Sequence, residues 1–396
     1  MSQKRKIAIF TGNRAEYGLQ VPIVRAISEH PDLEYFLLVS GAHLQEDFGS
    51  TVKEIEKDGF RVYSEVNLNV GEDTLFSTVQ SIGMGVLSLS KVLEEIAPDF
   101  HVVYADRFEG FSAVITSTQM GIPTAHIEGG DITEGGALDD SVRHAMTKLA
   151  HLHFTTNELA AERVRRLGEE SWRVFNVGFP ALDLVKLGNY ASSDEIGSKF
   201  KMNMDKPILV FTQHSVTTEY DVADIQVMPS LKAMQTLAQK GIQIMITYPN
   251  NDAGGKRIIG EIERLKNQRV ENLFFRKSLG RYFYHGFLNH CGLVGTGACV
   301  GNSSSGIKET PVFGCPTVNI GSRQDGRLRA TNVIDTSYDE KEIIQACEKC
   351  LYDVDFRTQS ENCHNPYDGG DSGKQVADVL ATIEIDRRLV QKKMTF

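Results

Sequence analysis

The chain of 396 residues has no apolar run approaching the ~20 residues that a helix needs to cross a membrane, which argues against a membrane protein. It also has fewer basic than acidic residues: Lys and Arg number 42, Asp and Glu number 52, and the net charge is −10. An acidic chain is a poor general binder of DNA or RNA, although a local basic pocket can still hold a small anion. The first residues lack the apolar stretch of a secretory signal, so we expect a cytoplasmic protein.

The common cofactor motifs are absent as well. No strand-like segment is followed by G-x-G-x-x-G, and no G-x-x-x-x-G-K-[ST] occurs, so the sequence argues against dinucleotide and P-loop chemistry. We therefore expect no cofactor. Cys347 and Cys350 form the one C-x-x-C pair, whereas a structural zinc site needs four ligands. We expect these two cysteines on the buried face of a helix, and no bound metal.

Short apolar segments alternate with helix-like segments along most of the chain, and most of them are apolar on both faces. This pattern is typical of strands buried in parallel sheets with helices as crossovers, which predicts an α/β protein. The predicted strands are 6–10, 35–40, 101–105, 122–127, 152–155, 173–177, 207–212, 242–248, 293–300 and 316–320. We expect an N-terminal domain (1–187), a polar linker (188–206), a second domain (207–373) and a C-terminal helix (374–396) that can pack back on the N-terminal domain.

In open parallel sheets, ligands bind at the carboxyl ends of the strands, and polar motifs follow several of the predicted strands. The small residues from Gly301 to Gly306 follow one strand and lead into a predicted helix, which favours a phosphate or diphosphate. Glu309, about one turn into that helix, could accept hydrogen bonds from a ribose. The equally plausible alternative is a serine-rich helix cap with a solvated Glu309. His214 follows another strand and could contact a phosphate or carry a proton.

Acidic residues follow the strands of the first domain. Asp106 and Glu109 come after one strand, Glu128 and Asp131 after another, and Asp139 and Asp140 begin a helix. An acid at a helix start is usually only a cap, but three carboxylate groups at one sheet edge should raise at least one pKa and prepare a general acid or base. Arg14 and Arg107 offer compensating cations.

Taken together, these segments resemble the hydrolysing UDP-N-acetylglucosamine 2-epimerases of sialic acid biosynthesis. The matching segments, in the family's order, are 12–17, 41–44, 106–109, 126–130, 139–151, 213–218, 249–254, 301–306 and 321–324. The resemblance implies a GT-B architecture, in which two Rossmann-like domains with parallel sheets face each other across a cleft that holds the nucleotide. It also implies the reaction of UDP-N-acetylglucosamine with water to give N-acetylmannosamine and UDP.

Site residues follow from the same resemblance. The implied catalytic residues are Asp106, Glu128, Asp139 and His214. The implied substrate contacts are Arg14, Ala15, Arg107, Arg143, His214, Asn250, Asp252, Ser278, Gly301, Ser303, Ser304, Glu309 and Arg323. The segment between Glu128 and Asp139 is longer than the family pattern, so Asp140 or Asp131 could take the place of Asp139.

Four other functions remain open. A hydrolysing epimerase acting on UDP-2,4-diacetamido-2,4,6-trideoxyglucose, for legionaminic acid, would share the fold and the nucleotide site. A GT-B glycosyltransferase would not need the acid cluster. A non-hydrolysing epimerase would release its product still attached to UDP, and a sensor would catalyse nothing. The family similarity alone suggests a homodimer or homotetramer.

Overall fold

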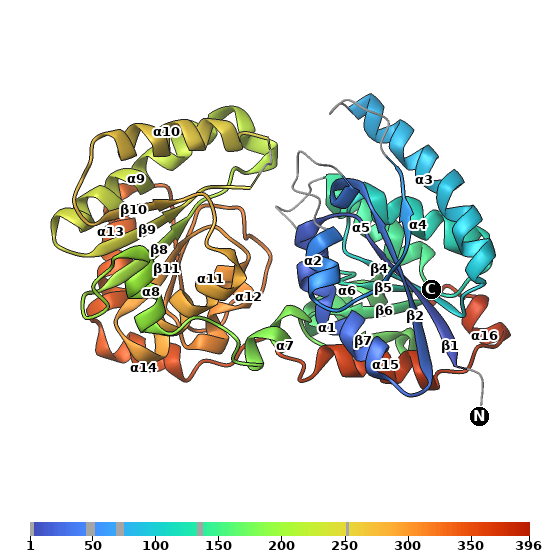
Figure 1. Ribbon diagram of the computed structural model, residues 1–396. Coiled ribbons are helices and arrows are strands. Elements are labelled where there is room, and N and C mark those ends of the chain that lie inside the picture. Colours follow the sequence, from blue (N-terminus) through green and yellow to red (C-terminus); the bar gives the residue numbers. More distant parts are fainter. Residues whose placement is uncertain (1–3, 45–51, 69–74, 133–137, 251–252) are drawn as a thin grey trace. The chain divides into compact units, whose positions relative to one another are not determined.

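The computed structural model describes residues 4–44, 52–68, 75–132, 138–250 and 253–396. The chain divides into two compact units, each built on a parallel sheet with helices on both faces (Figure 1). Unit 1 comprises residues 1–131, 138–184 and 367–396, and unit 2 comprises residues 132–137 and 185–366. The expected α/β class is therefore confirmed.

Unit 1 contains a seven-stranded parallel sheet in the order β3-β2-β1-β4-β5-β6-β7. Its strands are β1 (Arg5–Thr11), β2 (Leu33–Ser40), β3 (Val62–Val66), β4 (Phe100–Tyr104), β5 (Thr124–Ile127), β6 (Leu152–Thr155) and β7 (Val174–Asn176). The central strands β4, β5 and β6 are buried along their whole length, as expected for a sheet covered on both faces.

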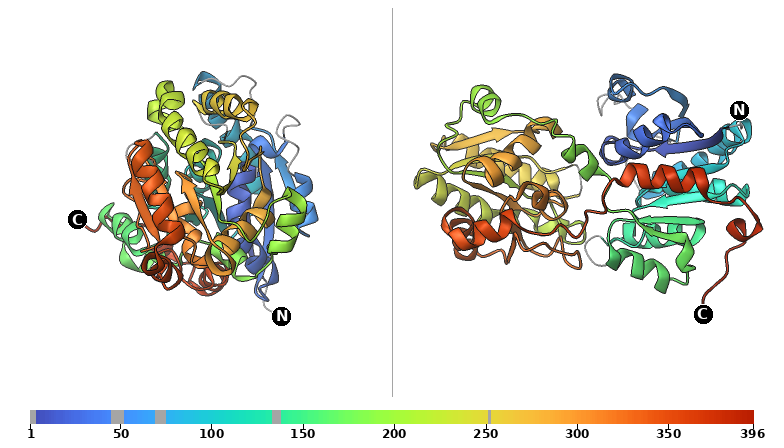
Figure 2. Two further views of the ribbon diagram at one scale, coloured as in Figure 1. Left: turned by 90° about the vertical axis from the view of Figure 1, so that its left-hand side faces the viewer. Right: turned by 90° about the horizontal axis from the view of Figure 1, so that it is seen from below.

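Two apolar layers enclose this sheet. One layer includes residues of α1 (Arg14–Glu29), α2 (Val52–Lys57) and α15 (Ser372–Thr382), and the other includes residues of α3 (Leu75–Ile96), α4 (Phe108–Gln119) and α5 (Leu138–Leu149). The C-terminal helix α15, drawn in red, lies beside the blue N-terminal elements of the same unit (Figure 2). Arg5 of β1 holds the end of this helix, because its Nη1 donates to the carbonyls of Leu380 and Ile383.

Unit 2 contains a six-stranded parallel sheet in the order β10-β9-β8-β11-β12-β13. Its strands are β8 (Ile208–Thr212), β9 (Gln243–Thr247), β10 (Leu273–Arg276), β11 (Gly297–Gly301), β12 (Thr317–Ile320) and β13 (Val333–Thr336). Helices α9 (Ala223–Gln239), α10 (Gly255–Asn267) and α13 (Glu340–Tyr352) contribute to the core on one face, and α8 (Ser193–Phe200) and α11 (Gly280–Asn289) to the core on the other.

The remaining helices are α6 (Glu158–Arg166), α7 (Ala181–Lys186), α12 (Ser305–Lys308), α14 (Val354–Glu361) and α16 (Arg387–Val390). Short 3₁₀ helices span 41–44, 171–173, 217–222 and 310–313, and a π-helical turn spans 290–294. Among the described residues, no helix combines the length and apolar character required to cross a bilayer. Cys347 and Cys350 are buried on α13, as expected.

The expected linker and the expected C-terminal helix both differ from the structure. Residues 188–206 contain α8, which begins with a capping box at Ser192 and buries Ile196 and Phe200 in unit 2. This segment is therefore part of a domain core, and its polar composition reflects capping and an exposed helix face. The tail helix α15 ends at Thr382, because Ile383 adopts an extended conformation, and a separate short helix α16 follows.

Candidate functional site

Two backbone kinks mark the carboxyl edge of the sheet in unit 1. Ala105, directly after β4, has φ +56°, and Glu128, directly after β5, has φ +66°. Residues with side chains rarely adopt this left-handed conformation, and such strain is concentrated at functional sites. The kinks occur at the two strand ends that carry Asp106 and Glu128, so the strain coincides with the expected catalytic acids.

Asp106 is held by a buried cation. Arg143 of α5 donates from Nη2 to Oδ2 of Asp106, and the side chain of Arg143 is only 4% exposed. A charge-assisted hydrogen bond of this kind fixes the direction of the carboxylate as well as balancing its charge. The structure therefore brings together two of the expected site residues, Asp106 from the turn after β4 and Arg143 from α5.

Two further carboxylates lie at the same sheet edge: Glu109, which the sequence placed in the acid cluster without a catalytic role, and Glu16, which the sequence did not single out. Burial, followed by the negative charge of Glu109, raises the pKa of Glu16 well above its usual value. Burial also raises the pKa of Glu109, against the opposing charge of Arg107, whose Nε lies 3.7 Å from Glu109 Oε2. A raised pKa was expected from clustered like charges, whereas burial is the larger cause for both glutamates and the neighbouring carboxylate adds to it.

Tyr104 is the last residue of β4 and precedes Ala105 and Asp106 in the chain. Its side chain is fully buried, and its pKa is raised well above 10 by that burial and then by the charges of Glu128, Asp131 and Glu16. The charges of Glu128 and Asp131, which follow β5, and of Glu16, in the first turn of α1, therefore all act on the end of β4. The phenol stays protonated, so it can serve these carboxylates only as a hydrogen-bond donor.

The three candidate aspartates differ in exposure. Asp131 and Asp140 are buried, whereas Asp139, in the first turn of α5, is exposed and adds a negative charge that acts on Glu109. The choice among them stays a prediction, because residues 133–137 lie outside the described residues. Arg14 and Ala15 begin α1, but their side chains also lie outside the description.

In unit 2, four polar groups lie at the carboxyl ends of neighbouring strands: His214 follows β8, Asn250 follows β9, Ser303 follows β11 and Arg323 follows β12. His214 is fixed between two loops. Its backbone amide donates to Asn302 Oδ1 (2.7 Å), and its ring Nδ1 accepts from the backbone amide of Asn250 (3.1 Å). Burial and the positive charge of Arg323 lower the pKa of His214 to about 3, so the ring is neutral.

Strand β11 requires glycine at its last position. Gly301 has φ +130°, and a Cβ atom there would lie 1.8 Å from the carbonyl oxygen of Thr212. Ser303 Oγ lies 3.0 Å from Ser305 Oγ, which in turn contacts Tyr284 Oη at 2.6 Å. These contacts bring a row of small polar groups to the edge of the sheet.

The expected helix position of Glu309 is wrong. Helix α12 has four residues and ends at Lys308, so Glu309 follows the helix rather than lying one turn inside it. A separate 3₁₀ helix begins at Thr310, with Pro311 in its first turn. Glu309 Oε2 instead lies 2.9 Å from Nε2 of His285 on α11, which orients the carboxylate.

Two other expected contacts, Ser278 and Asp252, stay predictions. Ser278 lies exposed after β10, where its Oγ accepts from the backbone amide of Gly280 (3.2 Å). Asp252 lies outside the described residues. Within the described part of the chain, no group of three or more His, Cys, Asp or Glu side chains is arranged to hold a metal ion.

Comparison with known proteins identifies the family of this chain. A family model described as UDP-N-acetylglucosamine 2-epimerase matches residues 25–381. The chain belongs to this family. It is 35% identical over 349 residues to a GDP/UDP-N,N′-diacetylbacillosamine 2-epimerase (hydrolyzing) of Campylobacter jejuni, covering 87% of each chain. It is 31% identical over 398 residues to a UDP-N-acetylglucosamine 2-epimerase of Neisseria meningitidis serogroup B, covering 98% of each.

A solved structure of a 2-epimerase has the same fold as this chain. The crystal structure of UDP-GlcNAc 2-epimerase from Neisseria meningitidis bound to UDP-GlcNAc matches with a TM-score of 0.79 at 17% identity, covering 95% of this chain and 99% of that one. The GT-B class of two Rossmann-like domains is therefore confirmed. The expectation that the two sheets face each other across a cleft stays a prediction.

Proposed function

We propose that this protein is a hydrolysing UDP-sugar 2-epimerase that converts UDP-N-acetylglucosamine and water into N-acetylmannosamine and UDP, as in sialic acid biosynthesis. The observation that carries the proposal is the pair of carboxylates at the ends of two neighbouring strands, Asp106 after β4 and Glu128 after β5, because inversion at C2 requires proton removal and return. The proposal requires that these acids and the polar loops of unit 2 act on one substrate molecule.

The chemistry explains why carboxylates are needed. The proton on C2 is not next to a carbonyl group, so its direct removal is too costly. Elimination offers a route: the C1–O bond breaks, UDP departs with the bonding electrons, and a carboxylate takes the C2 proton to leave a 1,2-unsaturated sugar. Water then adds at C1 while a proton returns to C2 from the opposite face. Each step depends on an acid or base held at a fixed position.

In this scheme Asp106, Glu128 and Asp139 are the acid and base residues. Arg143 donates to the carboxylate of Asp106 and orients it, which favours a base directly after β4. Burial raises the pKa values of Glu16 and Glu109, which lie at the same edge of the sheet.

The loops of unit 2 are assigned to the departing UDP. Because Nδ1 of His214 accepts the amide hydrogen of Asn250, the neutral ring carries its proton on Nε2 and can donate it to a diphosphate oxygen. Arg323, Ser303 and Ser304 are assigned to the same diphosphate, and Glu309 to the ribose. Stabilising the charge that develops on the leaving group lowers the barrier to elimination.

A second substrate is favoured by a specific observation. The Campylobacter jejuni relative, at 35% identity, is a hydrolysing epimerase of a diacetamido sugar. UDP-2,4-diacetamido-2,4,6-trideoxyglucose is therefore the second candidate, with the same elimination chemistry. Separate incubations with the two nucleotide sugars, followed by chromatography of free UDP and released sugar, would test both. Release of UDP from neither sugar would contradict the proposal.

Substitution of Glu128 tests the assignment of the acids. We expect Glu128→Gln to reduce kcat by roughly 10²-fold or more, because the amide cannot exchange a proton with C2. Glu158→Gln is the matched control, since Glu158 is exposed on α6 of the same unit and should leave kcat unchanged. A Glu128→Gln variant with the activity of the control would remove Glu128 from the mechanism.

A further inference from the structure

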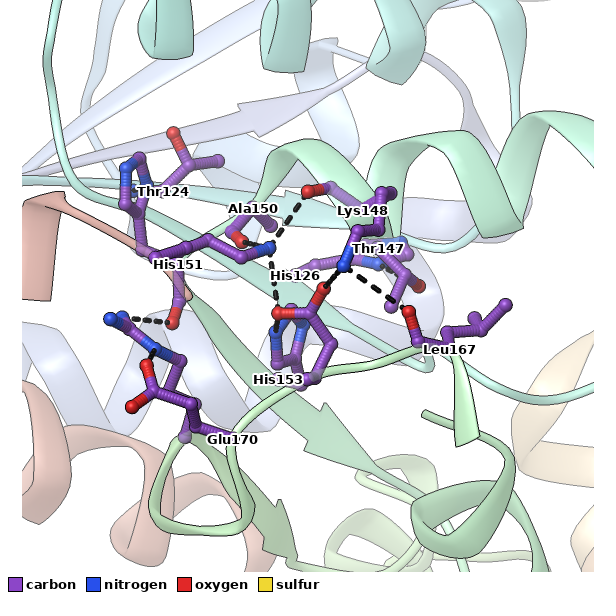
Figure 3. A network of polar contacts seen from close by, with 12 residues as sticks. Thr124, His126, Thr147, Lys148, Ala150, His151, His153, Leu167 and Glu170 are labelled. Atoms are coloured by element: carbon purple, nitrogen blue, oxygen red, sulfur yellow. Dashed lines mark hydrogen bonds and ion pairs between the residues drawn. The ribbon is translucent and has the colours of Figure 1, made fainter. Parts of the chain in front are cut away.

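We propose that His126 and Thr147 form a positioning pair that sets the geometry of the acids in unit 1 without touching the substrate. This inference rests on the proposed epimerase function. It concerns two fully buried residues, one on β5 and one on α5, to which the expected site assigned no role. Both lie within the polar network shown in Figure 3.

The imidazole of His126 bridges two elements of the site. Its Nε2 lies 2.6 Å from the carbonyl oxygen of Ala105, and its Nδ1 lies 3.0 Å from the hydroxyl oxygen of Thr147. A carbonyl can only accept a hydrogen bond, so Nε2 carries the ring proton. Nδ1 therefore accepts from the hydroxyl of Thr147. Burial lowers the pKa of His126 to about 4, which keeps the ring in this neutral form.

These contacts connect the turn that carries Asp106 to helix α5 at two points. Arg143 and Thr147 are four residues apart on α5 and therefore lie on the same face of the helix. Arg143 holds the carboxylate of Asp106, while Thr147 holds His126, which in turn holds the carbonyl of Ala105, the residue before Asp106. The backbone and the side chain of the Asp106 turn are thus each tied to α5 by a separate link.

The strained backbone needs this link. Ala105 has φ +56°, and such a conformation persists only where surrounding contacts hold it. The bond from His126 to the Ala105 carbonyl is one such contact. Gly129 makes room for it, because a Cβ atom there would lie 2.8 Å from Thr147 Oγ1 and 3.1 Å from His126 Nδ1. The contact between His126 and Thr147 therefore requires a residue without a side chain at position 129.

The pair matters for catalysis because α5 also carries Asp139 in its first turn. If the middle of α5 is released from β5, the separation of Asp106 and Asp139 is no longer fixed. A small misplacement of catalytic groups slows the chemical step strongly, while substrate binding, assigned largely to unit 2, should be unaffected. A positioning role therefore predicts a fall in kcat at nearly constant KM.

Thr147→Val tests this prediction, since valine keeps the shape of threonine and removes its hydroxyl. We expect kcat to fall about 10-fold or more with KM changed less than about twofold, and Thr147→Ser to restore most of the activity. Thr116→Val is the matched control. Thr116 is a buried threonine of α4 whose hydroxyl donates to the carbonyl of Ser112 (2.7 Å), so its loss should lower the unfolding midpoint similarly without changing kcat.

Substitution of His126 provides a second test of the positioning role. Glutamine places an amide nitrogen near the position of Nε2, so His126→Gln should retain more of kcat than His126→Leu. Equal kcat in Thr147→Val and Thr116→Val, or a loss confined to KM, would overturn the positioning role. An inactive wild-type protein on both nucleotide sugars would overturn the proposed function as well. An active wild type with an unchanged kcat in Thr147→Val would overturn the positioning role alone.

Discussion

His101 gives the sharpest test of how the site-bearing sheet responds to acid. This histidine lies on β4, three residues before Tyr104, with no exposed surface. Among the described residues, neither of its ring nitrogens has a hydrogen-bond partner. Burial lowers its pKa from 6.5 to about 3, because charging the ring inside the sheet would cost its hydration without any compensating contact.

The size of the effect follows from proton linkage. Between pH 6.5 and 3 the unfolded chain binds a proton at His101 and the folded chain does not, so the stability of the folded state falls as the pH falls. From pH 7 to pH 5 this single group removes about 2 kcal/mol, since each pH unit below 6.5 is worth about 1.4 kcal/mol. His101→Leu abolishes this loss, so the variant should gain about 2 kcal/mol relative to wild type over the same interval.

Urea unfolding at pH 7 and pH 5 measures this gain. Trp172 is the one tryptophan of the chain and lies in unit 1, so its fluorescence reports the unfolding of the correct unit. Val103→Ala, at a buried neighbour on β4 that cannot titrate, is the control and should cost the same free energy at both pH values. An identical His101→Leu effect at pH 7 and pH 5 would refute the reasoning.

Two further predictions concern other parts of the chain. Gly301→Ala should abolish UDP binding measured by titration calorimetry, because its Cβ would collide with the Thr212 carbonyl; wild-type affinity would show that the loop after β11 does not bind UDP. Lys392→Met should lower the free energy of unfolding of unit 1 by about 3 kcal/mol. The Nζ atom of Lys392 lies 2.7 Å from Oε2 of the buried Glu169 and donates to the carbonyls of Lys148 and Ala150 at the end of α5. Unchanged urea unfolding of that variant would contradict this role of the C-terminal tail.

The sequence predicted the central strands better than the edges. The strands that it missed, β3, β10 and β13, are all edge strands of the two sheets, and each is largely half-exposed. A strand covered on both faces is a continuous apolar run, whereas a half-exposed edge strand mixes polar and apolar residues like a loop. For the same reason the polar segment with α8 resembled a linker, since only Ile196 and Phe200 of that helix are buried.

The candidate site was predictable in part, because the carboxyl ends of parallel strands meet at one edge and the motifs follow those strands. The pairing of Asp106 with Arg143 could not be predicted, since it depends on how α5 packs on the sheet. The raised pKa values of Glu16 and Glu109 depend on burial, which single residues in loops and helix starts do not reveal. His126 matched the family pattern, but its bridging role requires the positions of two other elements.

Turnover in deuterated water tests the central claim most directly. The protein is incubated with UDP-N-acetylglucosamine, and separately with the diacetamido sugar, and the products are followed by proton NMR and mass spectrometry. The elimination mechanism predicts free UDP together with the C2-inverted sugar carrying one deuterium at C2. Inverted sugar still attached to UDP, or released sugar that keeps its original hydrogen at C2, would contradict it.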